Sequence, residues 1–271
     1  MLVGIISRKA GGSRRNAISR GFNILAATMR SKPSNATMRS DYRTLCRQLG
    51  GRLGRGEHLV LFGPRGIGKS TLLVELEKRL RDGGMPCARA PATRCLDDIT
   101  RALEQAYPTV ETHAIARRTA RARLWNAADL RRGVLLLDHL TEVSDAMVSF
   151  LRRLHGGVLG VLSVVDVEVE RERRHMRPWR LGATRIRMPR APNSALRELL
   201  RTRCTELGSP VPASETERRL LRAARGRPGW VIACAQRLAG ARYWQGRELF
   251  VTVLCTDTEI ALRQAAFHRP E

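Results

Sequence analysis

Short apolar runs alternate with amphipathic stretches over the first two thirds of the chain. Aliphatic runs of about four to eight residues are typical of strands buried on both faces of a parallel sheet. We expect strands at 59–62, 86–90, 134–137, 158–165 and 183–188. Between them, apolar residues recur every three or four positions, which predicts helices at 41–53, 70–82, 96–106, 114–130 and 144–154. This alternation indicates an α/β fold, with a parallel sheet between two helical layers.

The pattern changes after Pro189 and Pro192. Apolar residues then recur only at helical spacing, and Asn193 or Ser194 can cap the first of several helices. The predicted helices lie at 193–205, 214–224, 226–238 and 248–267. Three helices after an α/β core would form a small lid over a ligand bound at the sheet edge. The fold class predicted is therefore a three-layer αβα parallel sheet with a C-terminal helical lid.

A glycine-rich segment follows the first apolar run and carries the most specific motif in the chain. It reads Gly63-Pro64-Arg65-Gly66-Ile67-Gly68-Lys69-Ser70-Thr71 and satisfies the phosphate-loop pattern G-x-x-x-x-G-K-[ST]. Glycines allow successive N–H groups to turn toward a phosphate, and the following helix adds its positive N-terminal end. Lys69 would contact the β- and γ-phosphates, and the Ser70 hydroxyl would hold Mg²⁺. ATP and Mg²⁺ are the expected ligands; the alternative is an ordinary strand-to-helix turn.

A second phosphate-loop element is expected at the end of the strand 134–137. Asp138 follows four aliphatic residues, as a Walker B carboxylate that orders Mg²⁺ would. The next residue is His139, where many ATPases carry a glutamate that polarises the attacking water. Neutral imidazole can accept a proton, although His139 could equally be a packing residue. Glu142 is a further candidate base. Because His139 stands where a glutamate is usual, we expect ATP hydrolysis that is slow or stimulated by a partner.

Other candidate residues lie further along the chain. Ser163 and Asp166, near the end of the strand 158–165, could contact the γ-phosphate or the attacking water. One arginine of the charged stretch 168–180 could complete a neighbouring subunit's site, although an exposed charged helix explains most of this stretch. Its arginines are Arg171, Arg173, Arg174, Arg177 and Arg180.

The charge balance raises the question of nucleic acid. The 271 residues include 49 Lys and Arg against 25 Asp and Glu, a formal net charge of +24. Clustered cations gain affinity for nucleic acid by releasing counterions from its phosphates. Only four of the 49 are lysines, however, namely Lys9, Lys32, Lys69 and Lys78. Such a skew toward arginine is also what a GC-rich coding sequence produces at exposed positions, so both explanations stay open.

The first 40 residues differ in composition from the rest. They contain eight Lys and Arg and no carboxylate. We expect a disordered basic extension, which fits a transit peptide, a nucleic-acid-binding arm or an upstream addition from a misassigned start. The predicted division is this extension at 1–40, an α/β nucleotide-binding domain at 41–190, and the helical lid with a C-terminal helix at 191–271.

Cysteine usage and hydropathy bear on the compartment. The six cysteines are scattered and form no C-x-x-C pair, which favours reduced thiols over disulfides or a zinc site. No apolar stretch reaches the length needed to span a bilayer. We therefore expect a cytoplasmic protein that makes no membrane contact.

The order of these elements resembles an AAA+ ATPase over about residues 42–240. The resemblance rests on Gly63–Thr71, on Val134–Asp138, and on Gly226-Arg227-Pro228-Gly229, which is similar to the G-x-P segment that carries a sensor-2 arginine. It is strongest to the branch of origin-recognition ATPases and the transposition helpers of phage Mu and Tn7, and more distant to signal-transducing STAND ATPases. The resemblance implies that Lys69, Ser70 and Thr71 bind phosphate and Mg²⁺ and that Asp138 orders the metal. It also implies that Ser163 is a candidate for sensor 1 and that Arg227 reports lid closure.

Two functions follow from this resemblance. The first is an oligomeric ATP-binding AAA+ ATPase that acts on DNA as a transposition or replication helper. The second is an ATP-dependent signalling or assembly switch that acts on an unknown protein client, with the arginines reflecting codon usage. His139 departs from the acidic pair that is usual in the family, which places vigorous hydrolysis in doubt under either function.

Overall fold

The computed structural model describes residues 36–107, 133–140, 144–155, 160–165, 184–246 and 248–264, with the isolated helical positions 119, 122 and 124. Three sequence predictions lie mostly outside these residues: the extension at 1–40, the helix at 114–130 and the charged stretch at 168–180. Glu142 and Asp166 lie outside them as well.

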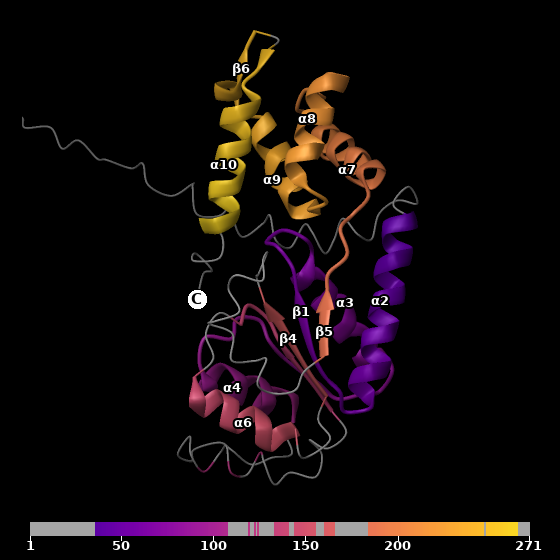
Figure 1. Cartoon of the computed structure of the whole chain (residues 1–271), viewed down its shortest axis with the longest axis vertical. Helices are drawn as coiled ribbons and strands as arrows, with labels where there is room; N and C mark the ends of the chain where they lie inside the picture. The colour runs from indigo at the N-terminus through magenta and orange to yellow at the C-terminus, as the bar shows by residue number, and fades with distance from the viewer. Residues whose placement is uncertain are drawn as a thin grey trace, which may run out of the picture.

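Five parallel strands form the central sheet (Figure 1). They are β1 (His58–Phe62), β2 (Cys87–Ala90), β3 (Val134–Leu137), β4 (Gly160–Val165) and β5 (Thr184–Arg187). Their order across the sheet is β2-β3-β4-β1-β5, so β4 separates the strand before the phosphate loop from the strand before Asp138. In the register, Ser163 of β4 lies opposite Leu137 of β3 and Val60 of β1.

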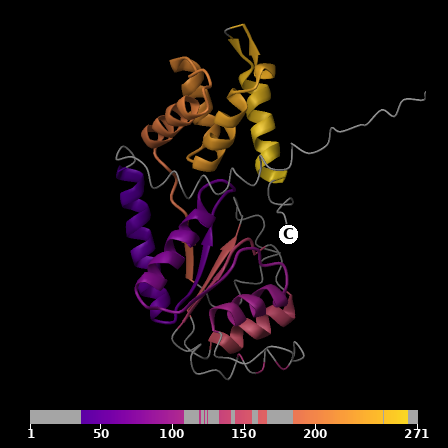
Figure 2. The ribbon, with the colours of Figure 1, turned by 180° about the vertical axis from the view of Figure 1, so that it is seen from behind.

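Helices cover both faces of the sheet, which confirms the three-layer prediction. Figures 1 and 2 show α2 (Ala36–Gly54) and α3 (Lys69–Asp82) on one side, with α4 (Leu96–Ala106) and α6 (Asp145–His155) on the other. Neighbouring residues of β3 face opposite ways: Leu135 joins the core beneath α4 and α6, and Leu136 joins the core beneath α2 and α3. All four residues of β3 are buried, as expected for a central strand.

The C-terminal part is helical and has its own apolar core around Trp230. It contains α7 (Asn193–Glu206), α8 (Ser214–Ala224), α9 (Pro228–Leu238) and α10 (Val251–Gln264). A short 3₁₀ turn at Ala241–Tyr243 and the hairpin of β6 (Trp244–Gln245) and β7 (Glu248–Leu249) separate α9 from α10. The sequence did not predict this hairpin, because each of its strands is only two residues long.

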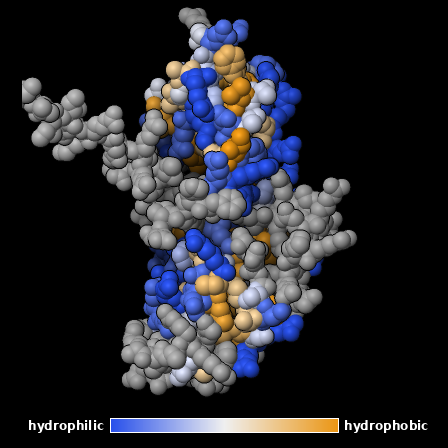
Figure 3. Space-filling model, turned by 90° about the vertical axis from the view of Figure 1, so that its left-hand side faces the viewer, coloured by the Kyte–Doolittle hydropathy of each residue, from blue (hydrophilic) through white to orange (hydrophobic). Residues whose placement is uncertain are grey.

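The surface of the helical part is mainly hydrophilic, with some apolar side chains on the side that carries α10 (Figure 3). Val253 and Ile260 of α10 are 51% and 46% exposed, and Phe250 just before it is 45% exposed. Every helix that the structure describes is too short or too polar to cross a membrane. All six cysteines are free, and burial raises the pKa of the Cys87 thiol to about 12.

Candidate nucleotide-binding site

The glycine-rich loop connects the end of β1 to the start of α3 in the conformation that its glycines permit. Gly66 and Gly68 have φ angles of 78° and 104°, a range that is unfavourable for residues with a side chain. Gly68 is the N-cap of α3 and provides no side-chain cap for the first turn of the helix. The N–H groups of that turn therefore lie at a helix N-terminus, where backbone donors and the helix dipole favour an anion.

Backbone carbonyl groups of the loop hold the Lys69 side chain in place. Its side chain is buried, and Nζ donates hydrogen bonds to the carbonyl oxygens of Gly63 (2.6 Å) and Pro64 (2.9 Å). A buried ammonium needs such partners to offset its lost hydration. They also fix the position of the charge at the mouth of the loop, where it can interact with the phosphates of a nucleotide.

Ser70, Asp138 and His139 form a compact polar network, although 68 residues separate Ser70 from Asp138. The Ser70 hydroxyl donates to Asp138 Oδ1 at 3.2 Å, and the backbone N–H of His139 donates to the same oxygen at 2.9 Å. His139 Nε2 lies 3.2 Å from Ser70 Oγ. Since the only Ser70 proton is used toward Asp138, the network closes with Nε2–H as donor to Ser70 Oγ.

Hydrogen bonds from a neighbouring strand and loop hold Asp138 in place. Its backbone N–H donates to Ala90 at the end of β2, and its carbonyl accepts from the N–H of Thr93. The side chain is only 1% exposed, so its carboxylate is directed at the network rather than at bulk water. Parallel strands bring their carboxyl ends to one edge of the sheet, which is why residues distant in sequence meet here.

The oxygen atoms of Ser70 and Asp138 match the ligands that Mg²⁺ prefers. Mg²⁺ is commonly held by one or two protein oxygens, with phosphate oxygens and water completing an octahedron. Among the described residues, no group of three or more His, Cys, Asp and Glu could hold a metal on its own. The site therefore fits a metal bound together with a nucleotide better than a metal held by the protein alone.

His139 has a strained backbone. Its φ of 51° lies in the left-handed region, one of two such cases among the described non-glycine residues. This conformation costs on the order of 1 kcal/mol for a residue with a side chain. It turns the chain sharply after Asp138, so that the imidazole faces Ser70 rather than continuing along the strand.

Tyr42 contacts the loop from α2, and the sequence analysis assigned it no role there. Its hydroxyl lies 3.1 Å from the carbonyl oxygen of Ile67 and 3.2 Å from that of Gly68. A Cβ atom at Gly68 would lie 2.0 Å from this hydroxyl, so the contact also requires glycine there. Burial raises the pKa of the Tyr42 hydroxyl, which keeps it protonated and able to donate.

The helical part contacts the loop directly at Gly66. The N–H of Gly229 donates to the carbonyl oxygen of Gly66 at 2.7 Å. Pro228 is the first residue of α9 and has no N–H, so Gly229 carries the first donor of this helix. The phosphate loop therefore caps α9. The contact is close, since a Cβ atom at Gly229 would lie 2.8 Å from Gly66 Cα.

Arg65 makes a second contact between the loop and the helical part. Its Nη1 donates to the carbonyl oxygen of Arg263, near the end of α10, at 2.8 Å. A basic group near a helix C-terminus is favourable, because the carbonyl oxygens there lack partners within the helix. The loop that would hold a nucleotide thus contacts two different helices of the C-terminal part.

Arg227 lies at the expected place in the sequence, but its guanidinium is engaged inside the helical part. It forms an ion pair with Glu259 of α10 and donates to the carbonyl oxygens of Ala223 and Ala224. The residue is 5% exposed. All hydrogen bonds described for this side chain are made within the C-terminal part, whereas Gly229, two residues later, contacts the loop.

The remaining predicted residues lie as follows. Ser163 is 2% exposed and sits two residues before the end of β4, below the edge of the sheet where Asp138 lies. Thr71 is half-buried in the first turn of α3, and Pro64 and Ile67 are buried or largely so within the loop. The structure thus brings the loop together with Asp138 and His139, and places Ser163 and Arg227 slightly apart from them.

A comparison with protein families identifies this architecture. Residues 52–168, from the end of α2 to just beyond β4, match the family described as the AAA domain. This segment is an AAA domain. No curated protein matches the sequence. The AAA+ domain holds the loop, Asp138, His139 and Ser163, whereas Arg227 lies outside the matched segment.

Solved structures share the fold of the AAA+ domain and of the helices that follow it. Drosophila ORC bound to DNA matches with a TM-score of 0.54 and 15% identity, over 96% of this chain and 71% of that one. Pyrobaculum aerophilum Cdc6p matches with a TM-score of 0.53 and 16% identity, over 75% of this chain and 62% of that one. Aeropyrum pernix Orc1 in complex with DNA matches with a TM-score of 0.51 and 17% identity, over 80% of this chain and 65% of that one. The chain therefore spans less than two thirds of the latter two proteins.

Proposed function

We propose that this AAA+ protein binds ATP with Mg²⁺ at the loop 63–71 and acts on DNA as a replication or transposition helper. The observation that carries the proposal is the network of Ser70, Asp138 and His139 beside the loop. The buried carboxylate of Asp138 lies 3.2 Å from the Ser70 hydroxyl. An ordinary strand-to-helix turn does not need such a pair. In phosphate-loop NTPases a hydroxyl and a carboxylate of this kind hold Mg²⁺ beside the nucleotide.

In this proposal the loop binds the phosphates and the strand ends hold the metal. Backbone N–H groups of residues 66–71 donate to phosphate oxygens, and Lys69 neutralises charge between the β- and γ-phosphates. Ser70 and Asp138 bind or orient Mg²⁺, which neutralises charge that develops on the phosphates. Tyr42 is a positioning residue, because its hydroxyl fixes two carbonyl groups on the outer side of the loop.

Hydrolysis in this proposal is slow or depends on a partner. His139 lies where a glutamate commonly polarises the attacking water, and its Nε2 is 3.2 Å from Ser70 Oγ. An imidazole engaged with a magnesium ligand is poorly placed to accept a proton from water. Glu142 and an arginine from the stretch 168–180 remain candidates to complete the site in an assembled form.

Arg227 in this proposal acts through the backbone. Its guanidinium joins Glu259 to the end of α8, and this arrangement fixes the turn that precedes Pro228. The first N–H donor of α9, on Gly229, is thereby held against Gly66. Lid closure would then be reported through the contact of α9 with the phosphate loop, rather than through a direct bond from Arg227 to a phosphate.

Support for action on DNA comes from charge and from similarity. The net charge of +24 favours phosphate-rich partners, and two of the similar structures, ORC and Orc1, contain DNA. The second candidate is a switch that acts on a protein client, as in STAND ATPases. The apolar side chains of Val253 and Ile260 on α10 favour it, because exposed apolar groups on one helix suit a protein contact or self-association.

The experiment that tests nucleotide binding compares Lys69→Ala with Lys78→Ala. Both variants remove one lysine from α3, but Lys78 is exposed and lies nine residues after Lys69 along the helix. We expect ATP with Mg²⁺ to raise the melting temperature of the wild type and of Lys78→Ala, and to leave Lys69→Ala unchanged. An equal rise in Lys69→Ala would refute the assigned site, because the loop would then not need its lysine.

A further inference from the structure

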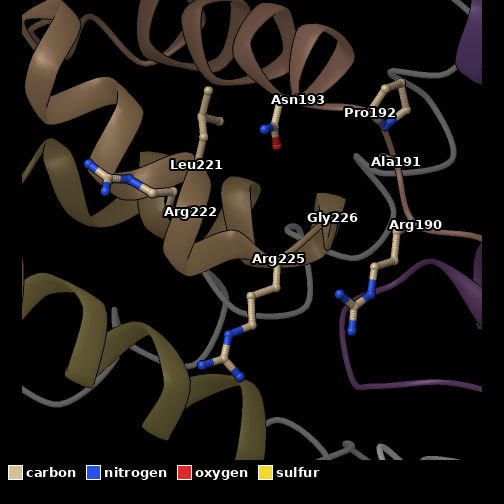
Figure 4. A pocket seen from close by; sticks show the side chains of 8 residues that line it. All are labelled: Arg190, Ala191, Pro192, Asn193, Leu221, Arg222, Arg225 and Gly226. Carbon is tan, nitrogen blue, oxygen red and sulfur yellow. The ribbon is translucent and has the colours of Figure 1, made fainter.

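A basic cavity lies where the strand β5 leads into the helical part. It has a volume of about 470 Å³, and its lining comes from residues 190–193 and 221–226 (Figure 4). The lining contains Arg190, Arg222 and Arg225, and none of the described lining residues is acidic. A second cavity of about 360 Å³, lined by residues 187–190, shares Arg190 with the first. The two cavities adjoin at Arg190, and their described lining residues include arginines but no carboxylate.

Three arginines that line these cavities form no ion pair with the residues that the structure describes. We define the junction arginines as Arg187, Arg190 and Arg225, all of which are exposed. No carboxylate among the described residues pairs with any of the three, whereas many other arginines do pair, such as Arg201 with Glu217. Arg222 differs, because it lies 3.5 Å from Glu215. Figure 4 shows the Arg190 and Arg225 side chains extending to the same side of Gly226, while Arg222 extends away from them.

The backbone at Gly226 holds Arg190 beside Arg225. Gly226 accepts a hydrogen bond from the N–H of Ala191 at 3.0 Å, and its φ is 78°. A Cβ atom at Gly226 would lie 2.5 Å from Arg190 Cβ, so the stem of Arg190 packs directly on this glycine. The arrangement therefore depends on a residue without a side chain between the two arginines.

Arg225 is itself strained. It ends α8 with a φ of 50° and a ψ of 40°, a left-handed conformation that helices usually assign to glycine. Gly226, the next residue, would meet this requirement at lower cost if the helix ended one residue later. Strain on a residue that lines a cavity is a recognised sign of function.

The N-terminus of α7 opens onto the same cavity. Pro192 is its N-cap and Asn193 its first residue, and both line the cavity. The first turn contains no acidic residue, and its N–H groups receive no side-chain cap. The helix dipole therefore adds positive potential to that of the arginines.

We propose that the junction arginines bind successive phosphates of a nucleic-acid backbone. The inference rests on the proposed action on DNA and assigns it a surface. Unpaired guanidinium groups spread over two adjoining cavities suit a chain of phosphates better than a single nucleotide, for which the loop 63–71 is the proposed site. Exposed arginines release counterions when they contact a phosphate backbone, and this gives affinity without sequence preference.

The test measures duplex DNA binding by the full chain between about 50 and 200 mM salt, with ATP and Mg²⁺ present. The variant is Arg190→Ala/Arg225→Gly, in which glycine suits the left-handed conformation at position 225. The control is Arg101→Ala/Arg218→Ala, which removes the same charge from exposed positions on α4 and α8 outside the cavity. Thermal melting establishes that both variants are folded.

The plot of log affinity against log salt has a negative slope, and loss of two phosphate contacts should make this slope less steep by about 1.8. The same loss should weaken binding on the order of 100-fold at 50 mM salt. The control should keep the wild-type slope, and Arg190→Lys/Arg225→Lys should retain most of it. Equal slopes for variant and control would overturn the inference while leaving the proposed function intact. Absence of DNA binding by the wild type would overturn both. Loss of ATP binding in the variant would show that the junction arginines serve the nucleotide instead.

Discussion

At the scale of single residues, His139 combines two unusual properties. Its backbone is in the left-handed region, and its side chain joins the network of Ser70 and Asp138. The strain indicates that the surrounding hydrogen bonds, above all from His139 N–H to Asp138, hold this residue in place. The position is therefore well fixed, and the identity of its side chain should decide how the site handles water.

We predict that His139→Glu raises the ATP turnover number about tenfold or more. A carboxylate at this position could polarise the attacking water, and positioned general bases contribute about 10² to 10⁴ in rate. The measurement is steady-state phosphate release at saturating ATP. His139→Asn is the control, since asparagine tolerates a positive φ but is a poor base, and it should not raise turnover. Fast wild-type turnover that fell in His139→Glu would show that His139 is itself a working catalytic group.

Residue patterns predicted some of the side chains that meet at the loop, but not all of their contacts. The loop, Lys69, Ser70 and Asp138 are candidates from the sequence because each belongs to a local motif with known chemistry. Tyr42 is not, because a tyrosine on an amphipathic helix also fits simple core packing, and its contact with Gly68 spans 26 residues. Arg227 is a candidate because of its motif, but the motif does not reveal that Glu259 of α10 holds its guanidinium.

At the scale of elements, the first turn of α9 is the key connection between the two parts of the chain. Because Pro228 lacks an N–H, the first free donor of the helix belongs to Gly229, and the phosphate loop accepts it. The first N–H of α9 is thus satisfied by the glycine-rich loop rather than by a group in the helical part. Anything that moves the loop must therefore either move α9 or break this bond.

We predict that Gly229→Ala weakens ATP binding by about tenfold or more, while the helical part stays folded. The new methyl group would lie 2.8 Å from Gly66 Cα and 2.9 Å from its carbonyl oxygen, so loop and helix must separate. The measurement is ATP titration by calorimetry, with circular dichroism to follow the helices. Gly50→Ala is the matched control, because a Cβ there would make only ordinary contacts at 3.7 and 3.8 Å with Leu76 and Leu80. Unchanged affinity in Gly229→Ala would show that loop and lid are not coupled.

Several element boundaries followed closely from the sequence, whereas the arrangement of elements did not. The helix predicted at 248–267 is wrong at its start, because residues 248–249 form β7 and α10 begins at Val251. The helix predicted at 96–106 matches α4 fully, and the one predicted at 214–224 matches α8. Helical spacing and caps are local signals, which a sequence displays directly. The order β2-β3-β4-β1-β5 depends on which strands pair, and five similar apolar runs carry no local mark of their neighbours. The hairpin of β6 and β7 was missed for a different reason, since two-residue strands have no periodicity.

At the scale of the whole molecule, nucleotide and DNA are expected to bind in a linked manner. Arg225, one of the junction arginines, is followed directly by Gly226. Gly226 lies three residues before Gly229, which contacts the phosphate loop. A ligand that fixes one side of this short segment should influence the other. Because binding linkage is reciprocal, each ligand should change the affinity of the other by the same factor.

We predict that ATP with Mg²⁺ tightens DNA binding by about 5- to 150-fold, the range typical of coupled sites, and that DNA tightens ATP binding equally. Fluorescence anisotropy of labelled duplex DNA, titrated with and without ATP, measures the first effect, and calorimetry the second. Lys69→Ala should retain the weak DNA affinity and lose the enhancement. DNA affinity no greater than that of an unrelated basic protein, or insensitive to ATP, would favour the switch that acts on proteins.

The contacts made by Arg65 and Gly66 have a mechanical consequence. The connector at residues 188–192 attaches the helical part at one point, and the bond from Gly229 to Gly66 attaches it at another. A body pinned at two points retains a single rotation, about the line that joins them. The bond from Arg65 to Arg263, on a different helix, opposes that rotation. Gly66 and Arg65 thus restrain the helical part in different ways, and we predict that loss of the Arg65 bond alone would let that part rotate about the line through the other two attachments.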